Sequence, residues 1–383
     1  MKNIYLDNAA ATPISSRVKK EVDRGMKIYG NPSSFNNIGR QSAKELREAR
    51  LKVARFLGAH PEEVIFTSSG SEANNMAIQG AMNNEQGIVI TTPIEHPSVL
   101  EPIKQLEKEG HEVRYLPVDR YGFVDSKSVQ NMLTTNCSLI SIMYANNEIG
   151  TIEPINKIGK IIRAFRKKGT RFPLFHVDAC QAAGSLNMNV NSLNVDLLTF
   201  NGSKIGGPRG IGVLYVRRGT NLEPFILGGG QEKGLRAGTE NLPAILGLAK
   251  AIELIDEKKS VQLGKLKNYF IEKIKEINPN IKFNGPIGRY RLANNINISI
   301  SGLDSENLLL ELDKYGVYAG SGSACTSRAV EPSHVLKAIG VEKKYLSGAL
   351  RFSLGRETTK KDLDYVLKIL PKVISDLKNR YKK

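Results

Sequence analysis

Val64-Ile-Phe-Thr-Ser-Ser-Gly-Ser71 is a short apolar run that ends in small polar residues, and a helix-compatible segment, 72–84, follows it. The same succession recurs through residues 63–217, where β-branched runs alternate with helix-like segments. Such alternation predicts βαβ crossovers and a largely parallel sheet. We therefore expect an α/β fold.

Polar residues also follow the other predicted strands. In open α/β sheets, ligands bind beyond the carboxyl ends of the strands. A functional site is therefore expected among the residues that follow them. The runs and the polar residues after them are 88–91 with Glu95 and His96, 139–145 with Asn146, and 174–177 with Asp178.

The pattern changes after Val216. Gly228-Gly229-Gly230 leads into a long, charged and helix-compatible segment, 243–277, which has the character of a domain connection. We predict a large domain over 14–255 with the mostly parallel sheet. A smaller α+β domain is predicted to combine 1–13 with 256–383.

The composition is that of a globular protein. Of the 383 residues 40% are hydrophobic and 24% charged, which excludes extensive disorder. No run approaches the ~20 apolar residues of a membrane span, and the first residues lack an apolar signal core, so we expect a cytoplasmic protein without a membrane partner.

The cysteines and the net charge bear on the cellular compartment and the possible partners of the protein. Three widely spaced cysteines, Cys137, Cys180 and Cys325, suit a reducing compartment and argue against disulfides or a Cys-rich metal site, and no metal is expected. The net charge of +17 comes from scattered Lys and Arg pairs. Two explanations remain open: a solvated basic surface, or an anionic partner such as nucleic acid or an acidic protein.

Lys204 lies in Phe200-Asn-Gly-Ser-Lys204-Ile-Gly-Gly, after a predicted strand and among glycines. A lysine held close to a compact ligand can form a Schiff base with an aldehyde cofactor; a surface lysine in a turn has the same local sequence. Asp178 ends an earlier strand, where a carboxylate could keep a pyridine nitrogen protonated or simply cap a turn.

Three further features fit a flat, phosphorylated cofactor. Ser69-Gly70-Ser71 before a helix offers backbone N–H groups to a phosphate, although an ordinary serine N-cap has the same letters. His96 could stack on a ring and transfer protons, or be structural. Asn146 and Gln181 offer amide contacts, or are turn and core residues.

Cys325 lies in Gly320-Ser-Gly-Ser-Ala-Cys325, a run of small residues that favours exposure of the thiol. A reactive cysteine needs access and some thiolate character, whereas a structural one is more often found within an apolar run. Cys137 and Cys180 are expected to pack in the interior or near the site.

Taken together and in order, these residues resemble the cysteine desulfurases of the NifS/IscS type over nearly the whole chain. The motifs that carry the resemblance are Tyr5-Leu-Asp-Asn-Ala-Ala-Ala-Thr-Pro13, Gly30-Asn-Pro-Ser-Ser34, Phe66-Thr-Ser-Ser-Gly-Ser-Glu-Ala-Asn74, Glu95-His96, Asn146-Asn-Glu-Ile-Gly150, His176-Val-Asp-Ala-Cys-Gln181, Lys204, Arg236-Ala-Gly-Thr239, Ser321-Gly-Ser-Ala-Cys-Thr326 and Arg351-Phe-Ser-Leu-Gly-Arg356.

The resemblance implies the aspartate-aminotransferase-like fold (fold type I), a homodimer, and pyridoxal 5'-phosphate as cofactor. It also implies a role for each site residue: Lys204 as the Schiff-base lysine, Asp178 facing the pyridine nitrogen, His96 over the ring, Asn146 and Gln181 near its phenolic oxygen, Gly70, Ser71 and Ser203 on the phosphate with Thr239 from the partner subunit, and Arg351 with Asn31 on the substrate carboxylate.

Two positions depart from the family pattern. Ser203 stands where a histidine usually precedes the lysine, so it can donate a hydrogen bond but carries no charge. Cys180 stands where threonine is usual, which places an extra thiol near the cofactor. Neither departure threatens the role of Lys204.

The implied activity removes sulfur from L-cysteine, giving alanine and a persulfide on Cys325. The sulfur acceptor would be an iron-sulfur scaffold protein or a tRNA-thiolation partner. The alternatives are a selenocysteine lyase or another β-lyase on the same fold, and a binding protein that has lost catalysis. The presence of Cys325 argues against a β-lyase, and the retention of Lys204, Asp178, His96 and Arg351 argues against loss of activity.

Overall fold

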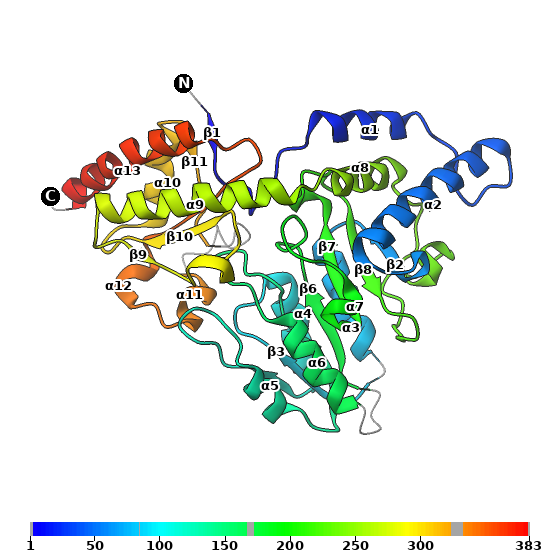
Figure 1. The fold of residues 1–383 in the computed structure, drawn as a ribbon. Helices are drawn as coiled ribbons and strands as arrows, with labels where there is room; N and C mark the ends of the chain where they lie inside the picture. The colour runs from blue at the N-terminus through cyan, green and yellow to red at the C-terminus, as the bar shows by residue number, and fades with distance from the viewer. Residues whose placement is uncertain (1–2, 84, 167–171, 323–331, 382–383) are drawn as a thin grey trace.

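The computed structural model describes residues 3–83, 85–166, 172–322 and 332–381, and a mixed seven-stranded sheet forms its centre (Figure 1). The strand order is β2-β8-β7-β6-β5-β3-β4. β8 is antiparallel to both of its neighbours, and the other adjacent strands are parallel. The α/β class with a mostly parallel sheet is therefore confirmed. The strands are β2 (Val64–Thr67), β3 (Ile88–Thr91), β4 (Val113–Tyr115), β5 (Cys137–Ser141), β6 (Leu174–Asp178), β7 (Leu197–Asn201) and β8 (Gly212–Val216).

Helices cover both faces of this sheet because successive side chains of each strand point to opposite sides. In β2, Ile65 joins the core under α3 (Gly70–Met82) and α4 (Pro97–Lys108), while Val64 and Phe66 join the core on the other face. The second face is covered by α2 (Asn37–Leu57), α5 (Ser126–Met132), α6 (Ile155–Arg166), α7 (Val190–Leu193) and α8 (Leu242–Glu253), and α1 (Ser16–Met26) packs on α8.

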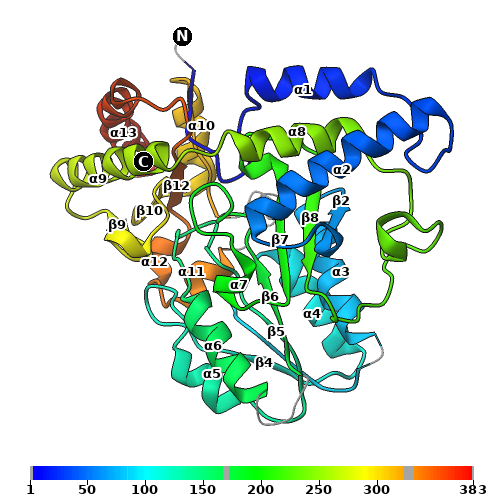
Figure 2. The ribbon, with the colours of Figure 1, turned by 45° about the vertical axis from the view of Figure 1, so that its right-hand side comes forward.

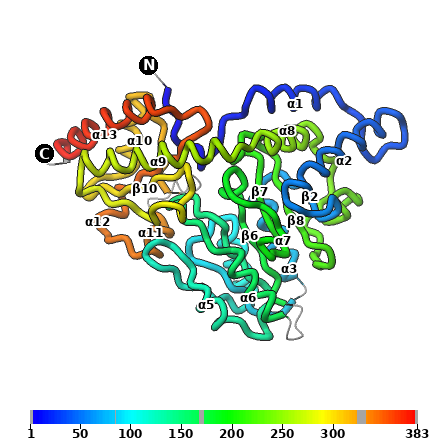
Figure 3. The backbone as a smooth tube through the Cα atoms, in the orientation of Figure 1, coloured from blue at the N-terminus to red at the C-terminus, as the bar shows by residue number. Residues whose placement is uncertain are grey.

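A second hydrophobic core lies beside the sheet, to the left in Figure 2, under α9, α10 and α13. It contains a three-stranded antiparallel sheet, β12-β10-β9, and a parallel pair, β1-β11. In Figure 3 the blue N-terminal segment accordingly lies among the orange and red C-terminal part. The elements are β1 (Ile4–Tyr5), α9 (Glu257–Ile277), β9 (Lys282–Phe283), β10 (Asn295–Ser299), α10 (Ser305–Asp313), β11 (Val317–Tyr318), α11 (His334–Ala338), α12 (Lys343–Leu346), β12 (Ala349–Ser353) and α13 (Lys360–Tyr381).

The helix-compatible segment 243–277 forms two helices, α8 and α9, rather than one. Asp256 accepts a hydrogen bond from the backbone N–H of Lys258 at 2.9 Å and so caps the start of α9. α8 contributes to the core of the large sheet and α9 to the second core. The domain limits 14–255 and 256–383 remain a prediction.

None of the helices within residues 3–83, 85–166, 172–322 and 332–381 has both the length and the apolar character needed to span a membrane.

Candidate active site

The carboxyl ends of β6 and β7 place Asp178 and Lys204 at the same edge of the sheet. Asp178 is the last residue of β6 and is only 5% exposed. Lys204 lies in the short 3₁₀ turn Gly202–Lys204 directly after β7, the parallel neighbour of β6. This is the edge where parallel α/β sheets bind ligands, as the sequence predicts.

Two N–H groups hold the Asp178 carboxylate. Asn74 Nδ2 donates to Oδ2 at 2.9 Å, and the backbone N–H of Cys180 donates to Oδ1 at 2.9 Å. Both donors stabilise the ionised carboxylate. An anion in this position can hold a protonated ring nitrogen opposite it.

The N-terminal turn Asp7–Ala10 lies against Lys204. Lys204 Nζ donates to the carbonyl oxygens of Ala9 at 2.8 Å and Ala10 at 2.5 Å. Gln181 Nε2 donates to the same Ala9 oxygen at 2.9 Å. The lysine and the glutamine expected at one cofactor therefore share a backbone acceptor.

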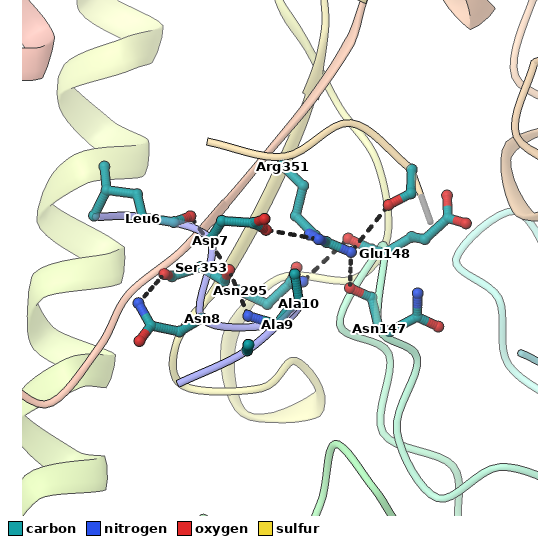
Figure 4. Close-up of polar contacts among 12 residues, drawn as sticks. Leu6, Asp7, Asn8, Ala9, Ala10, Asn147, Glu148, Asn295, Arg351 and Ser353 are labelled. Carbon is teal, nitrogen blue, oxygen red and sulfur yellow. Dashed lines mark hydrogen bonds and ion pairs between the residues drawn. The ribbon is translucent and has the colours of Figure 1, made fainter. Parts of the chain in front are cut away.

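The same turn reaches Arg351, which projects from β12 and is 2% exposed (Figure 4). Its Nη2 lies 2.8 Å from Asp7 Oδ1, and its Nη1 donates to the carbonyl oxygens of Asn147 at 3.1 Å and Gly322 at 3.0 Å. The buried Nε has no hydrogen-bond partner in the described part of the chain. Arg351 thus holds a carboxylate of its own chain and keeps one donor available.

Glu148 lies beside Arg351 and contacts both sides of the segment that contains Cys325. Its Oε2 accepts a hydrogen bond from Ser333 Oγ at 2.5 Å, and a Cβ added to Gly322 would lie 3.0 Å from the same oxygen. Burial raises the pKa of the Glu148 carboxyl. Cys325 itself lies outside the described residues.

The predicted phosphate site lies at the N-terminus of α3. Ser69 caps the helix by accepting from the backbone N–H of Glu72 at 3.1 Å, and Gly70 and Ser71 form its first turn. A Cβ on Gly70 would lie 2.7 Å from Cys180 Sγ and 2.9 Å from Asn201 Nδ2, so a larger residue would displace these side chains. Ser203 Oγ donates to Asn201 Oδ1 at 3.2 Å.

Cys180 packs beside Asp178, as the sequence suggests for an extra thiol near the cofactor. Burial, followed by the negative charge of Asp178, raises the pKa of the Cys180 thiol well above its usual value. A thiol that stays protonated is a poor nucleophile. Cys180 is therefore a packing residue of this site.

His96 is the N-cap of α4. Its Nδ1 accepts a hydrogen bond from the backbone N–H of Ser98 at 3.1 Å and lies 2.8 Å from Ser98 Oγ. Burial lowers the pKa of His96 below its usual value. His96 and Ser71 line one hollow of about 400 Å³ on the protein surface.

Three further predicted residues lie in turns and loops of the described chain. The Asn146 side chain serves its own turn: Oδ1 accepts from the backbone N–H groups of Glu148 at 2.8 Å and Ile149 at 2.9 Å. Asn31 lies in the turn between α1 and α2. Thr239 is exposed in the loop before α8.

The sequence did not predict the roles of Asp7, Asn74 and Ser98 in the site. Asp7 and Asn74 lie within motifs of the family resemblance, but nothing in the letters says which partners they have. One signal was available for Asn74: it occupies a buried position among the apolar residues of α3, where an amide requires partners.

Comparison with known proteins agrees with this geometry. Residues 4–366 match the family described as Aminotransferase class-V. The chain belongs to that family of enzymes, which depends on pyridoxal phosphate.

Individual relatives narrow the assignment. A protein of Dictyoglomus turgidum named "Cysteine desulfurase IscS" is 45% identical, with 98% of this chain and 96% of that protein aligned. A protein of the same name from Methanosarcina thermophila is 44% identical, with 99% of this chain and 93% of that protein aligned. A solved structure titled "NIFS-LIKE PROTEIN" superposes with a TM-score of 0.91 at 34% identity, covering 98% of this chain and 100% of that one. Within the class-V family, the chain is an enzyme of the cysteine desulfurase group.

The residues of the site fit pyridoxal phosphate. The cofactor's ring nitrogen, aldehyde and phosphate are matched by a buried carboxylate, by an amine on the adjacent strand end and by a helix N-terminus that begins with glycine. The fit does not depend on the histidine that Ser203 replaces.

Proposed function

We propose that the enzyme removes sulfur from L-cysteine with Lys204, Asp178, His96 and Arg351 around the cofactor, and that Cys325 receives the sulfur as a persulfide. One observation supports an α-amino-acid substrate above all: the turn Asp7–Ala10 touches Lys204 on one side and Arg351 on the other. An amine and a guanidinium separated by one short turn match the two ends of an amino acid. A solved structure titled "SspA in complex with cysteine" has a TM-score of 0.81 to this chain.

Each residue has a defined task in this proposal. Lys204 carries the cofactor and then takes the proton from the substrate Cα, and Asp178 stabilises the positive ring nitrogen. When bound, the cofactor accepts the electron pair that the Cα proton leaves behind. Arg351 binds the substrate carboxylate, for which its buried Nε is the available donor.

Sulfur is transferred by a nucleophilic displacement at the substrate sulfur atom. The Cys325 thiolate forms an S–S bond with the substrate sulfur while the Cβ–S bond breaks, and that electron pair remains on carbon. Proton uptake then gives alanine, and His96 is the proposed proton-transfer partner. A sulfur acceptor, an iron-sulfur scaffold or a tRNA-thiolation protein, takes the persulfide sulfur.

We also propose a homodimer in which Thr239 and Asn31 complete the site of the partner subunit. Large apolar side chains are exposed in both of the segments concerned: Phe35 at 93% and Tyr29 at 80% near Asn31, and Leu227 at 82% before Thr239. Such residues commonly mark protein interfaces. Gel filtration with light scattering tests this, and Phe35→Asp is expected to give a monomer with reduced affinity for pyridoxal phosphate.

Thiolate and persulfide chemistry requires a reducing compartment, so the cytoplasm is the proposed location. The experiment that tests the whole proposal is incubation with L-cysteine, followed by measurement of alanine and of persulfide at Cys325 by peptide mapping. Equal amounts of both before reductant is added are expected. Pyruvate and sulfide formed in place of alanine, with no sulfur on Cys325, would favour the β-lyase alternative.

A further inference from the structure

A chain of hydrogen bonds joins Asp178 to His96 through two side chains outside the roles described above. Asn74 Nδ2 donates to Asp178 Oδ2 and to Ser98 Oγ, each at 2.9 Å. Ser98 Oγ in turn lies 2.8 Å from His96 Nδ1. Asn74 lies in α3 and Ser98 in the first turn of α4, so the chain connects two helices to the strand end that carries Asp178.

The direction of these bonds follows from Asp178. An ionised carboxylate only accepts hydrogen bonds, so the Asn74 atom that faces it is the NH2 group. One hydrogen of that group goes to Asp178 and the other to Ser98 Oγ. The Ser98 oxygen accepts from Asn74 and keeps its own hydrogen, which it can donate to His96 Nδ1.

A second contact decides the direction. The backbone N–H of Ser98 lies 3.1 Å from His96 Nδ1, and a backbone N–H can only donate. Nδ1 therefore accepts from the backbone and from the hydroxyl of the same residue. A ring nitrogen that accepts carries no proton, so the neutral imidazole has its proton on Nε2.

We propose that Asn74 and Ser98 are positioning residues that hold His96 as a neutral imidazole protonated on Nε2. This inference rests on the proposed function, in which His96 belongs to the cofactor site, and it specifies the resting form of that residue. His96 then presents an N–H donor at Nε2. A second proton would place an N–H on Nδ1 opposite the Ser98 amide, so that contact would be lost and the Ser98 hydroxyl would have to turn to accept instead of donate.

The charges that face His96 act in both directions. Asp178 favours a second proton on the ring, while Lys204, His334 and Arg351 oppose it, and burial opposes it most. His334 comes from α11, where its Nε2 lies 2.9 Å from the carbonyl oxygen of Glu95. The contacts of Nδ1 with Ser98 add to the factors that keep the ring neutral.

The test is ¹⁵N NMR of the holoenzyme with labelled histidine at neutral pH. Nitrogen shifts and couplings distinguish a protonated ring nitrogen from a bare one, and the His96 signals are those absent from His96→Gln. We expect a bare Nδ1 and a protonated Nε2. A proton on Nδ1 in the native enzyme overturns the inference without any further variant.

Ser98→Ala and Ser98→Thr form a matched pair that keeps the backbone N–H and differs in the hydroxyl. Ser98→Ala is expected to raise the pKa of His96 in an NMR titration, because the neutral ring loses an acceptor contact; Ser98→Thr should retain the native value. An unchanged pKa in Ser98→Ala contradicts the role of Ser98. Full activity of His96→Gln would instead contradict the proposed function while leaving the tautomer result intact.

Discussion

Asp7 and Arg351 are 344 positions apart in the sequence, and their side chains form an ion pair with 2.8 Å between Oδ1 and Nη2. The pair neutralises a guanidinium that is almost entirely buried. Two backbone carbonyls fix Nη1, so the guanidinium has one orientation, with Nε left over. In the proposed function, a substrate carboxylate would thus meet a donor that the chain has already oriented.

Replacing Arg351 with glutamine is expected to raise KM for L-cysteine about 10- to 100-fold, since a charge-assisted hydrogen bond contributes about 1.5–3 kcal/mol. Initial rates of alanine formation over a range of cysteine concentrations measure this. Cysteamine, which lacks the carboxylate, should bind equally well to both proteins. Arg356→Gln, at an exposed position five residues further on, is the control. An unchanged KM in Arg351→Gln would remove Arg351 from substrate binding.

Lys204→Ala is expected to abolish turnover and the visible absorbance of covalently held cofactor, because Lys204 is the lysine proposed to bind the cofactor covalently. Borohydride reduction of the native enzyme followed by peptide mapping checks the assignment directly. Label on a lysine other than Lys204 would show it to be wrong.

Asp178→Asn is expected to keep the cofactor but lose at least about 100-fold in kcat, the scale found when one preorganised electrostatic partner is removed. A neutral amide cannot hold the ring nitrogen in its protonated form. Absorbance reports cofactor content, and alanine formation reports kcat. Asp376→Asn, at an exposed position of α13, should behave like the native enzyme. Near-native turnover of Asp178→Asn would mean that Asp178 has another task.

Cys325→Ser should leave the spectral change on addition of cysteine intact and stop the release of sulfide and alanine, because the thiolate acts only after the substrate is bound. Both signals are recorded with a reductant present. Cys137→Ala, at a buried position of β5, controls for the loss of a thiol elsewhere. Release of both products by Cys325→Ser at the native rate would show that the reaction does not run through this thiol, and pyruvate in place of alanine would assign the activity to the β-lyase class.

Glu153 predicts a pH dependence of stability. Burial raises the pKa of this carboxyl to about 8, whereas the pKa in the unfolded chain is the ordinary 4.5 of a glutamate. Between these values the unfolded state releases a proton that the folded state retains, so stability falls as pH rises from 4.5 to about 8 and this effect then levels off. Glu153→Gln should remove that fall, by up to about 1.4 kcal/mol per pH unit.

Urea unfolding at several pH values measures this difference, with Glu107→Gln on the exposed side of α4 as control. Native protein and Glu153→Gln that respond equally to pH over this range would show that Glu153 is ionised in the folded state.

Local patterns predicted the sheet well because strand ends and turns depend on neighbouring residues. The predicted strands 64–67 and 88–91 coincide with β2 and β3. The break between α8 and α9 was missed, since Asp256 in a charged segment is equally suitable for a helix surface and for a cap. Only the path of the chain in the folded structure shows that Asp256 is a cap.

The site was predicted through the family resemblance rather than through spacing. Asp178 and Lys204 belong to neighbouring strand ends, so the sequence could suggest that they meet. The link from Asn74 to Ser98 joins two helices, and the ion pair of Asp7 with Arg351 joins opposite ends of the chain. Such contacts depend on tertiary packing and leave no periodic signal in the sequence.

The pairing of β1 with β11 also determines when this enzyme can be completed during synthesis on the ribosome. Ile4 and Tyr5 are among the first residues made, yet their strand partners are Val317 and Tyr318. The turn that follows them accepts a hydrogen bond from Lys204, and Asp7 in this turn pairs with Arg351, which is synthesised much later. Closing so long a loop is slow relative to local folding. The contacts that orient Arg351 therefore form only late in biosynthesis, after nearly the whole chain has been made.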